Sequence, residues 1–131
     1  MYIENTVVSP ELLSDQLSRS VNPSLIRFDL PSLIENMKLE RSWEKGELKS
    51  MILLKSPSKK ILLTIMPKGT EITSLQTNDS ITFQIIEGEI KLYFRKECLT
   101  LNKGELLTLN ENSRFKIYSV EESAFLLTLE S

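Results

Sequence analysis

Between Asn78 and Phe115 the chain alternates apolar and polar residues, and the alternation is interrupted at Gly88 and Gly104. A period of two is the pattern of a β-strand with one buried face, because successive side chains of a strand point to opposite sides. Glycine accepts the positive φ angles that tight turns demand. The segment therefore predicts consecutive strands that are joined by short turns and share one buried face.

The same strand-like pattern runs from Leu48 to the end of the chain. The predicted strands and strand pairs comprise residues 48–56, 59–66, 81–94, 98–109, 114–120 and 123–130. We expect the third and fourth of these segments to be hairpins that turn at Gly88 and Gly104. Strands of similar length with turns about every eight to twelve residues predict an all-β sandwich or barrel.

The first third of the chain has a helical pattern instead. Ser9 and Pro10 indicate a helix start, since a hydroxyl side chain caps the first turn and proline suits the first helical position. Leu13, Leu17 and Val21 then recur at four-residue spacing, which gives that helix one apolar face.

A second, shorter helix is predicted around Pro31. Its apolar face comprises Leu30, Leu33, Ile34 and Met37. We expect residues 1–47 to form a helical arm that packs on the barrel, and residues 48–131 to form the barrel, within one structural domain.

Charge and composition argue against two classes of partner. The 131 residues include 16 basic and 18 acidic side chains, with no basic block, so the cationic surface that binds nucleic acid is missing. No apolar run approaches the roughly 20 residues of a membrane-spanning helix. The N-terminal residues lack the pattern of a signal peptide, and the single Cys98 cannot form an intrachain disulfide. We therefore expect a cytoplasmic protein with no nucleic-acid and no membrane partner, in which Cys98 packs as a small apolar residue.

The glycine spacing resembles that of the cupin superfamily, whose members are small barrels also called double-stranded β-helices. Their first motif is similar to G-x5-H-x-H-x3-E-x6-G, and Gly69 and Gly88 occupy its two ends here. Their second motif is similar to G-x5-P-x-G-x2-H, which would begin at Gly104. The resemblance covers about residues 48–129, and the arm is similar to that of small bacterial cupins. It implies a jelly-roll barrel with a short N-terminal helical arm.

The resemblance also implies which positions would bind a metal ion. In a typical cupin three histidines and a glutamate do so, and the corresponding residues here are Leu75, Thr77, Ile81 and Phe115. None of these is a good ligand, because transition metals need imidazole, thiolate or carboxylate donors. A shift of one residue would replace Leu75 by Gln76, which is also a poor ligand. We therefore expect no metal and no cofactor.

A site for calcium or magnesium would need carboxylates alone. Glu71 and Asp79 are the candidates for that purpose, and we expect both to face water from a loop.

Strand alternation predicts which side chains accompany Ile81 on the inward face. The expected interior is apolar and comprises Leu75, Ile81, Phe83, Ile85, Phe115 and Ile117. Two interpretations are open. Either these side chains fill the barrel, as in many small barrels, or they line a pocket for a small ligand. The polar anchor of such a ligand would be Gln76, Thr77, Tyr93 or Tyr118.

Catalysis has little support in this sequence. It contains no histidine, the side chain that most often transfers protons near neutral pH. Tyr93, Tyr118 and Lys91 are the remaining candidates, and no activating partner for them is identifiable. We predict a non-enzymatic, metal-free cupin-fold protein without catalytic residues, which binds a small apolar or amphipathic molecule or acts through the surface of a homodimer. Two alternatives remain: a metal-independent isomerase or lyase acting on a sugar or small acid, and a sensor or regulatory partner protein.

Two features bear on the expected homodimer, a state that is common among small cupins. Trp43 lies between the arm and the first strand, so it either pins the arm to the barrel or lies at a subunit contact. The apolar segments at 51–55 and 61–66 suit a contact between subunits, since a bare apolar edge promotes aggregation.

Overall fold

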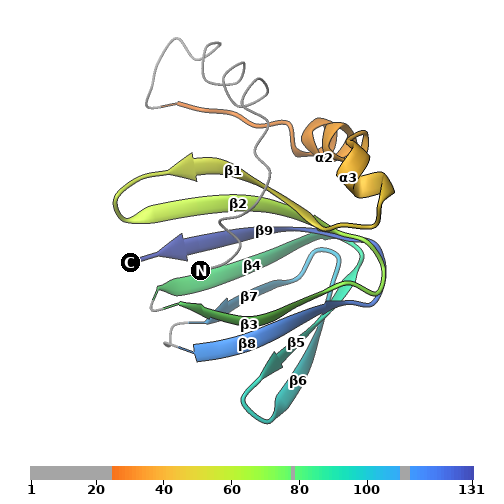
Figure 1. Ribbon diagram of the computed structural model, residues 1–131. Helices are drawn as coiled ribbons and strands as arrows, with labels where there is room; N and C mark the ends of the chain where they lie inside the picture. Colours follow the sequence, from red (N-terminus) through yellow and green to blue (C-terminus); the bar gives the residue numbers. More distant parts are fainter. Residues whose placement is uncertain (1–24, 78, 110–112) are drawn as a thin grey trace.

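The computed structural model describes residues 25–77, 79–109 and 113–131 (Figure 1). The helix predicted between Ser9 and Val21 lies outside these residues. The described elements, in chain order, are α2 (Leu30–Lys38), α3 (Arg41–Glu44), β1 (Lys49–Lys55), β2 (Lys59–Met66), β3 (Glu71–Thr77), β4 (Ser80–Glu87), β5 (Glu89–Phe94), β6 (Glu97–Asn102), β7 (Leu106–Leu109), β8 (Ser113–Ser119) and β9 (Ser123–Glu130).

The strands form two antiparallel sheets that face each other (Figure 1). One sheet has the order β1-β2-β9-β4-β7 and the other the order β3-β8-β5-β6. From β4 onward the chain repeatedly crosses between the two sheets, which is the topology of a jelly roll. The prediction of an all-β jelly-roll protein with a short N-terminal helical arm is confirmed. No helix within the described ranges is long and apolar enough to cross a membrane.

The two hairpins predicted at the glycines are wrong. Strands β4 and β5 belong to different sheets, and so do β6 and β7. Gly88 and Gly104 do have positive φ angles, of 88° and 87°, but they turn corners between sheets. The alternation of apolar and polar residues cannot distinguish a hairpin from a corner between sheets. In both, the apolar residues of the two strands face the same interior. A hairpin forms instead between β5 and β6, where Arg95 takes the positive φ and no glycine marks the turn.

The five-stranded sheet is buried on both faces over β1, β2 and β9. On β2, Leu62 and Met66 face the opposite sheet, while Leu63 and Ile65 face the arm. A strand that is covered on both sides needs apolar residues at successive positions. This double burial explains why β2 has a continuous apolar run, whereas β4 alternates.

Helix α2 covers the outer face of this sheet. Asp29 caps the helix, because its carboxylate accepts hydrogen bonds from the backbone N–H and the hydroxyl of Ser32 at 3.3 and 2.8 Å. Leu33, Ile34 and Met37 are buried against the sheet. The helix predicted around Pro31 and its apolar face are thereby confirmed.

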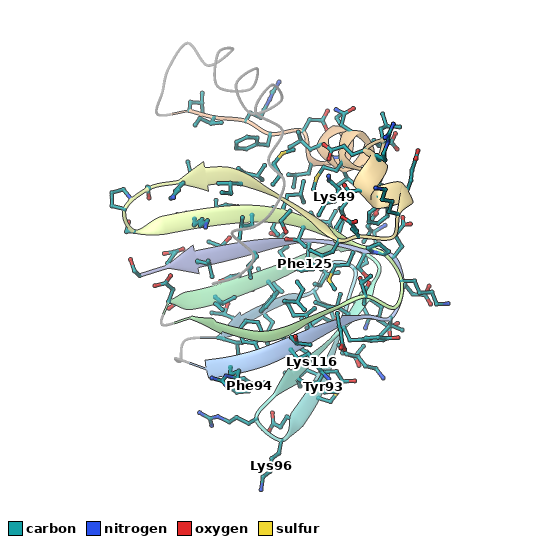
Figure 2. All side chains as sticks on the ribbon, in the orientation of Figure 1. Lys49, Tyr93, Phe94, Lys96, Lys116 and Phe125 are labelled. Atoms are coloured by element: carbon teal, nitrogen blue, oxygen red, sulfur yellow. The ribbon has the colours of Figure 1, made fainter. Side chains whose placement is uncertain are left out.

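Two lysines attach the arm to the sheet by charge. Lys38 Nζ lies 2.9 Å from Glu87 Oε1 and 2.7 Å from Glu122 Oε2. Burial lowers the pKa of Lys38, but hydrogen bonds to Glu122 and Glu87 outweigh it, so the pKa rises above its ordinary value. Lys49 lies beneath the arm (Figure 2), is only 2% exposed and pairs with Glu40.

Trp43 belongs to this attachment as well. Its ring packs against the apolar cluster between the arm and the sheet, and Lys38 Nζ lies 5.9 Å from the ring centroid. The interpretation in which Trp43 pins the arm to the barrel agrees with these contacts.

The corner at Gly88 is held closely against the turn that joins β8 to β9. The hydroxyl of Ser123 accepts a hydrogen bond from the backbone N–H of Glu89 at 3.1 Å and donates to the carbonyl of Glu121 at 2.7 Å. A Cβ atom on Gly88 would lie 2.3 Å from the carbonyl oxygen of Glu122. The two turns therefore approach each other more closely than any residue with a side chain allows.

This geometry makes Gly88→Ala a damaging change, and Gly104→Ala is its matched control. Both alanines would adopt a positive φ, which costs about 1–2 kcal/mol, but a Cβ on Gly104 meets no atom within 4 Å. At Gly88 the added methyl group also overpacks the contact with Glu122, which should lower the unfolding free energy by roughly a further 1–3 kcal/mol. Chemical denaturation should give a clearly larger loss of unfolding free energy for Gly88→Ala, and equal losses would contradict the close contact.

Candidate functional site

The space between the two sheets is the place where a cupin-like site is expected. Ile81 and Phe83 enter it from β4, and Phe115 and Ile117 enter it from β8; all four are at most 3% exposed. The two members of each pair are two positions apart along the strand, so strand alternation turns both to the same side. The structure therefore brings these four sequence-predicted residues together in one apolar cluster.

Three phenylalanine rings form the centre of this cluster. The centroids of Phe83 and Phe115 lie 5.7 Å apart with the rings nearly perpendicular, and those of Phe83 and Phe125 lie 5.9 Å apart. Edge-to-face pairs of this kind contribute about 0.5–1.5 kcal/mol beyond the burial of their area. Phe83 and Phe125 expose none of their surface, so even a water-sized space is missing beside these two rings.

Sequence reasoning missed the part that Phe125 plays. This residue lies on β9 (Figure 2), whose Phe125, Leu127 and Leu129 all face the interior. The alternation in residues 123–130 puts Phe125, Leu127 and Leu129 on one face of the strand. This pattern could have identified Phe125 as an interior residue.

The first two ligand positions implied by the resemblance lie on β3. Its backbone pairs Leu75 with Phe115, Gln76 with Arg114 and Thr77 with Ser113. The side chains of residues 74–77 lie outside the described part of the structure. The backbone register places Leu75 directly opposite Phe115, the residue that the resemblance aligns with the second-motif histidine.

The metal that typical cupins bind does not fit the residues of this chain. Ile81 and Phe115 stand at two of the four ligand positions, and both are surrounded by hydrocarbon. Leucine, isoleucine and phenylalanine have no lone pair to donate. Among the side chains that the structure describes, no three of histidine, cysteine, aspartate or glutamate gather closely enough to hold a metal ion.

Glu71, one of the two carboxylates considered for a calcium or magnesium site, lies at the surface. Glu71 is the first residue of β3 rather than part of a loop, and its carboxylate lies 4.0 Å from Lys116 Nζ. It is half exposed, so it serves as a surface charge.

The interior position expected for Tyr93 is wrong. Ile90 and Leu92 of β5 face the interior, so Tyr93 faces outward, where it is 37% exposed. Its ring lies 4.8 Å from Lys116 Nζ, on the outer side of the four-stranded sheet (Figure 2). Tyr118 follows Ile117 on β8 and shares this outer face by the same alternation. Neither hydroxyl is placed to anchor a ligand in the interior.

The position expected for Cys98 is also wrong. It is exposed, and its cross-strand partner is Tyr93, so it lies on the same outer face. The expectation that Cys98 packs as a small apolar residue is wrong because it is out of phase with Leu99 and Leu101 on β6.

The buried polar groups in the described ranges offer no acid or base to the interior. Lys49 is their only titratable member, and it pairs with Glu40 on the side of the sheet that faces the arm. Ser50 and Thr64 face the interior, but their hydroxyls bond to each other at 2.6 Å. An isomerase or lyase would need a proton-transferring group at the reacting atoms, and these side chains do not supply one.

Comparison with known proteins places the fold but not the function. No protein-family model matches the chain, and no curated protein matches it either. Solved structures do match, including the EutQ protein of Clostridium difficile, with a TM-score of 0.67, 16% identity and coverage of 85% of this chain and 91% of that one. A cupin superfamily protein from Desulfitobacterium hafniense matches with a TM-score of 0.63, 18% identity and coverage of 65% and 78%.

A third similar structure, a cupin-2 domain protein from Shewanella frigidimarina, has a TM-score of 0.63 and 15% identity over 79% of this chain and 94% of that one. At such identities the likeness concerns the backbone. The chain has the cupin fold, as its glycine spacing predicted, and the chemistry of the site has to be argued from its own residues.

The packed phenylalanine cluster leads to a prediction about Phe83. Replacing this ring by alanine should lower the unfolding free energy by about 3–5 kcal/mol, the range for deletion of a buried phenylalanine. Phe94→Ala is the control, because Phe94 is only partly buried at the margin of the same cluster, and its loss should be smaller. Urea denaturation of both variants measures the difference. A nearly neutral Phe83→Ala would contradict a filled interior and favour an open pocket.

Proposed function

We propose that this protein is a non-enzymatic, metal-free cupin-fold protein of the cytoplasm that works by binding, as a homodimer. The observation that carries the proposal is the contact of Phe83 with Phe115 and Phe125, because Phe115 stands where the resemblance to cupins implies a metal-binding histidine. A cluster of hydrocarbon can stabilise a barrel, but it cannot polarise a substrate or move a proton.

Binding of a small apolar or amphipathic molecule belongs to the same proposal. Such a molecule would not displace the phenylalanine cluster, since the loss of a packed aromatic contact is costly. It would bind nearer the ends of the strands, where apolar side chains are half buried and polar groups are within reach.

The homodimer contact is proposed at β1. In the described part of the chain, β1 pairs only with β2, so its other edge carries unpaired backbone groups. Ile52 and Leu54 are half buried there, and proteins cover exposed apolar edges because these recruit other strands. The segment at 61–66, also expected at the contact, instead lies between β1 and β9 as part of β2. Two copies of β1 paired about a two-fold axis would satisfy both edges.

Sedimentation equilibrium tests this contact. Wild-type protein should be a dimer in the micromolar range, and Leu54→Lys should shift it toward monomer, because lysine on an edge strand opposes pairing. The matched control is Leu106→Lys, which changes a leucine that is 60% exposed on β7 at the opposite edge of the sheet. This control should remain dimeric.

Circular dichroism of both variants checks that the fold is intact. A wild-type protein that is monomeric throughout the range would contradict the homodimer. A folded Leu54→Lys variant that dimerises like wild type would contradict the placement of the contact at β1.

A further inference from the structure

A pocket of about 290 Å³ lies at the end of the five-stranded sheet where β1 turns into β2. The start of β4 and the end of β9 reach the same end of the sheet (Figure 1). The residues that line the pocket are Lys55, Ser56, Pro57, Ser58, Lys59, Lys60, Asp79, Leu129 and Ser131. Its volume is close to the lower end of the range for small-molecule sites, about 300 Å³.

Two of the lysines directly face each other. Lys55 on β1 and Lys60 on β2 are cross-strand partners, and like charges in this arrangement repel and destabilise a sheet. Neither lysine forms an ion pair with another described residue, in contrast to Lys38 and Lys49. The pair therefore concentrates positive charge at this end of the sheet.

The strand register turns this pair toward the mouth of the barrel. Lys60 is the cross-strand partner of Leu129, and Leu129 is the partner of Ile81. Residues paired in this way lie on the same face of the sheet. Leu129 and Ile81 both face the interior, so Lys55 and Lys60 extend the interior face at the open end of the sheet. The pocket is thus at the edge of the filled interior and does not overlap the phenylalanine cluster.

The lining combines cationic, hydroxyl and apolar groups. Lys55 and Lys60 bring two positive charges on this face, against one negative charge from Asp79. Serine hydroxyls can donate further hydrogen bonds to an anion. Leu129 and Pro57 provide an apolar wall. An inorganic ion would make no apolar contact with this wall, whereas an organic ligand could.

We propose that this pocket binds a phosphate dianion carried by a small, partly apolar molecule. A phosphate monoester has a charge of about −1.5 to −2 at neutral pH and three acceptor oxygens. It therefore balances the charge of two facing ammonium groups better than a ligand with a single carboxylate would. The inference rests on the proposed function in one respect, that the protein binds a small molecule, and it adds where this occurs and which group is recognised.

The test is a titration of ¹⁵N-labelled full-length protein with phenyl phosphate, inorganic phosphate and benzoate, followed by NMR. Phenyl phosphate should shift the amide signals of Ser58, Lys60 and Leu129, with the shifts saturating. Lys55→Met/Lys60→Met should weaken this binding about tenfold or more, the effect expected when charge-assisted hydrogen bonds are lost. Added salt should also weaken it.

Lys96→Met is the matched control. Lys96 lies in the β5–β6 turn, at the far end of the molecule in Figure 2. Its replacement removes one positive charge, against two in the double variant, without touching the pocket. Equal binding by Lys96→Met and the double variant, or no saturable shift at Ser58, Lys60 and Leu129, would overturn the proposal. So would benzoate binding as tightly as phenyl phosphate.

The two phosphate probes distinguish the source of the dianion. Tighter binding of phenyl phosphate supports a phosphorylated small molecule, whereas equal binding of inorganic phosphate would overturn the apolar part of the proposal. The homodimer is tested separately by sedimentation. A monomer that binds phenyl phosphate here would contradict the homodimer alone, and a dimer that shows no such binding would contradict the pocket alone.

Discussion

The structure depends on burial of the five-stranded sheet on both of its faces. On the inner side, Phe83, Phe115 and Phe125 pack between the two sheets. On the outer side, Leu33 and Met37 of α2 cover Leu63 and Ile65. Each apolar side chain that is withdrawn from water contributes roughly 1.5–3 kcal/mol, so the arm and the opposite sheet stabilise the same strands. Lys38 then fixes the arm to the turns through Glu87 and Glu122.

This packing has a consequence for function. In a barrel of this size the interior can be filled by side chains or left open for a ligand and its ion. Here Ile81 and Phe115 lie buried in the apolar cluster, and neither side chain can donate to a metal ion. What remains for interaction is the edge of the sheet at β1 and the rim of the barrel, where Lys55 and Lys60 face each other. Both lie outside the filled region, so a contact there would not disturb the core.

Much of the fold could be predicted because it follows from local pattern. The alternation that places Ile81, Phe83, Phe115 and Ile117 in the interior is a property of single strands. The pairing of strands was not predictable in the same way, because a glycine such as Gly88 permits both a hairpin and a corner between sheets. The contact of Gly88 with the turn at Glu122 joins segments far apart in the sequence. The outward position of Tyr93 needed the phase of Ile90 and Leu92 on the same strand. The facing of Lys55 and Lys60 is a property of the register between two strands, and their role was therefore not identifiable from either segment alone.

The central claim is that apolar side chains have taken the place of the metal ligands in a preserved cupin fold. Isothermal titration of the purified, chelator-treated protein with Zn²⁺ and with Fe²⁺ tests it most directly, since such ions bind sites of three or more protein donors tightly. The account predicts no stoichiometric binding of either ion. One tightly held equivalent per chain would contradict it.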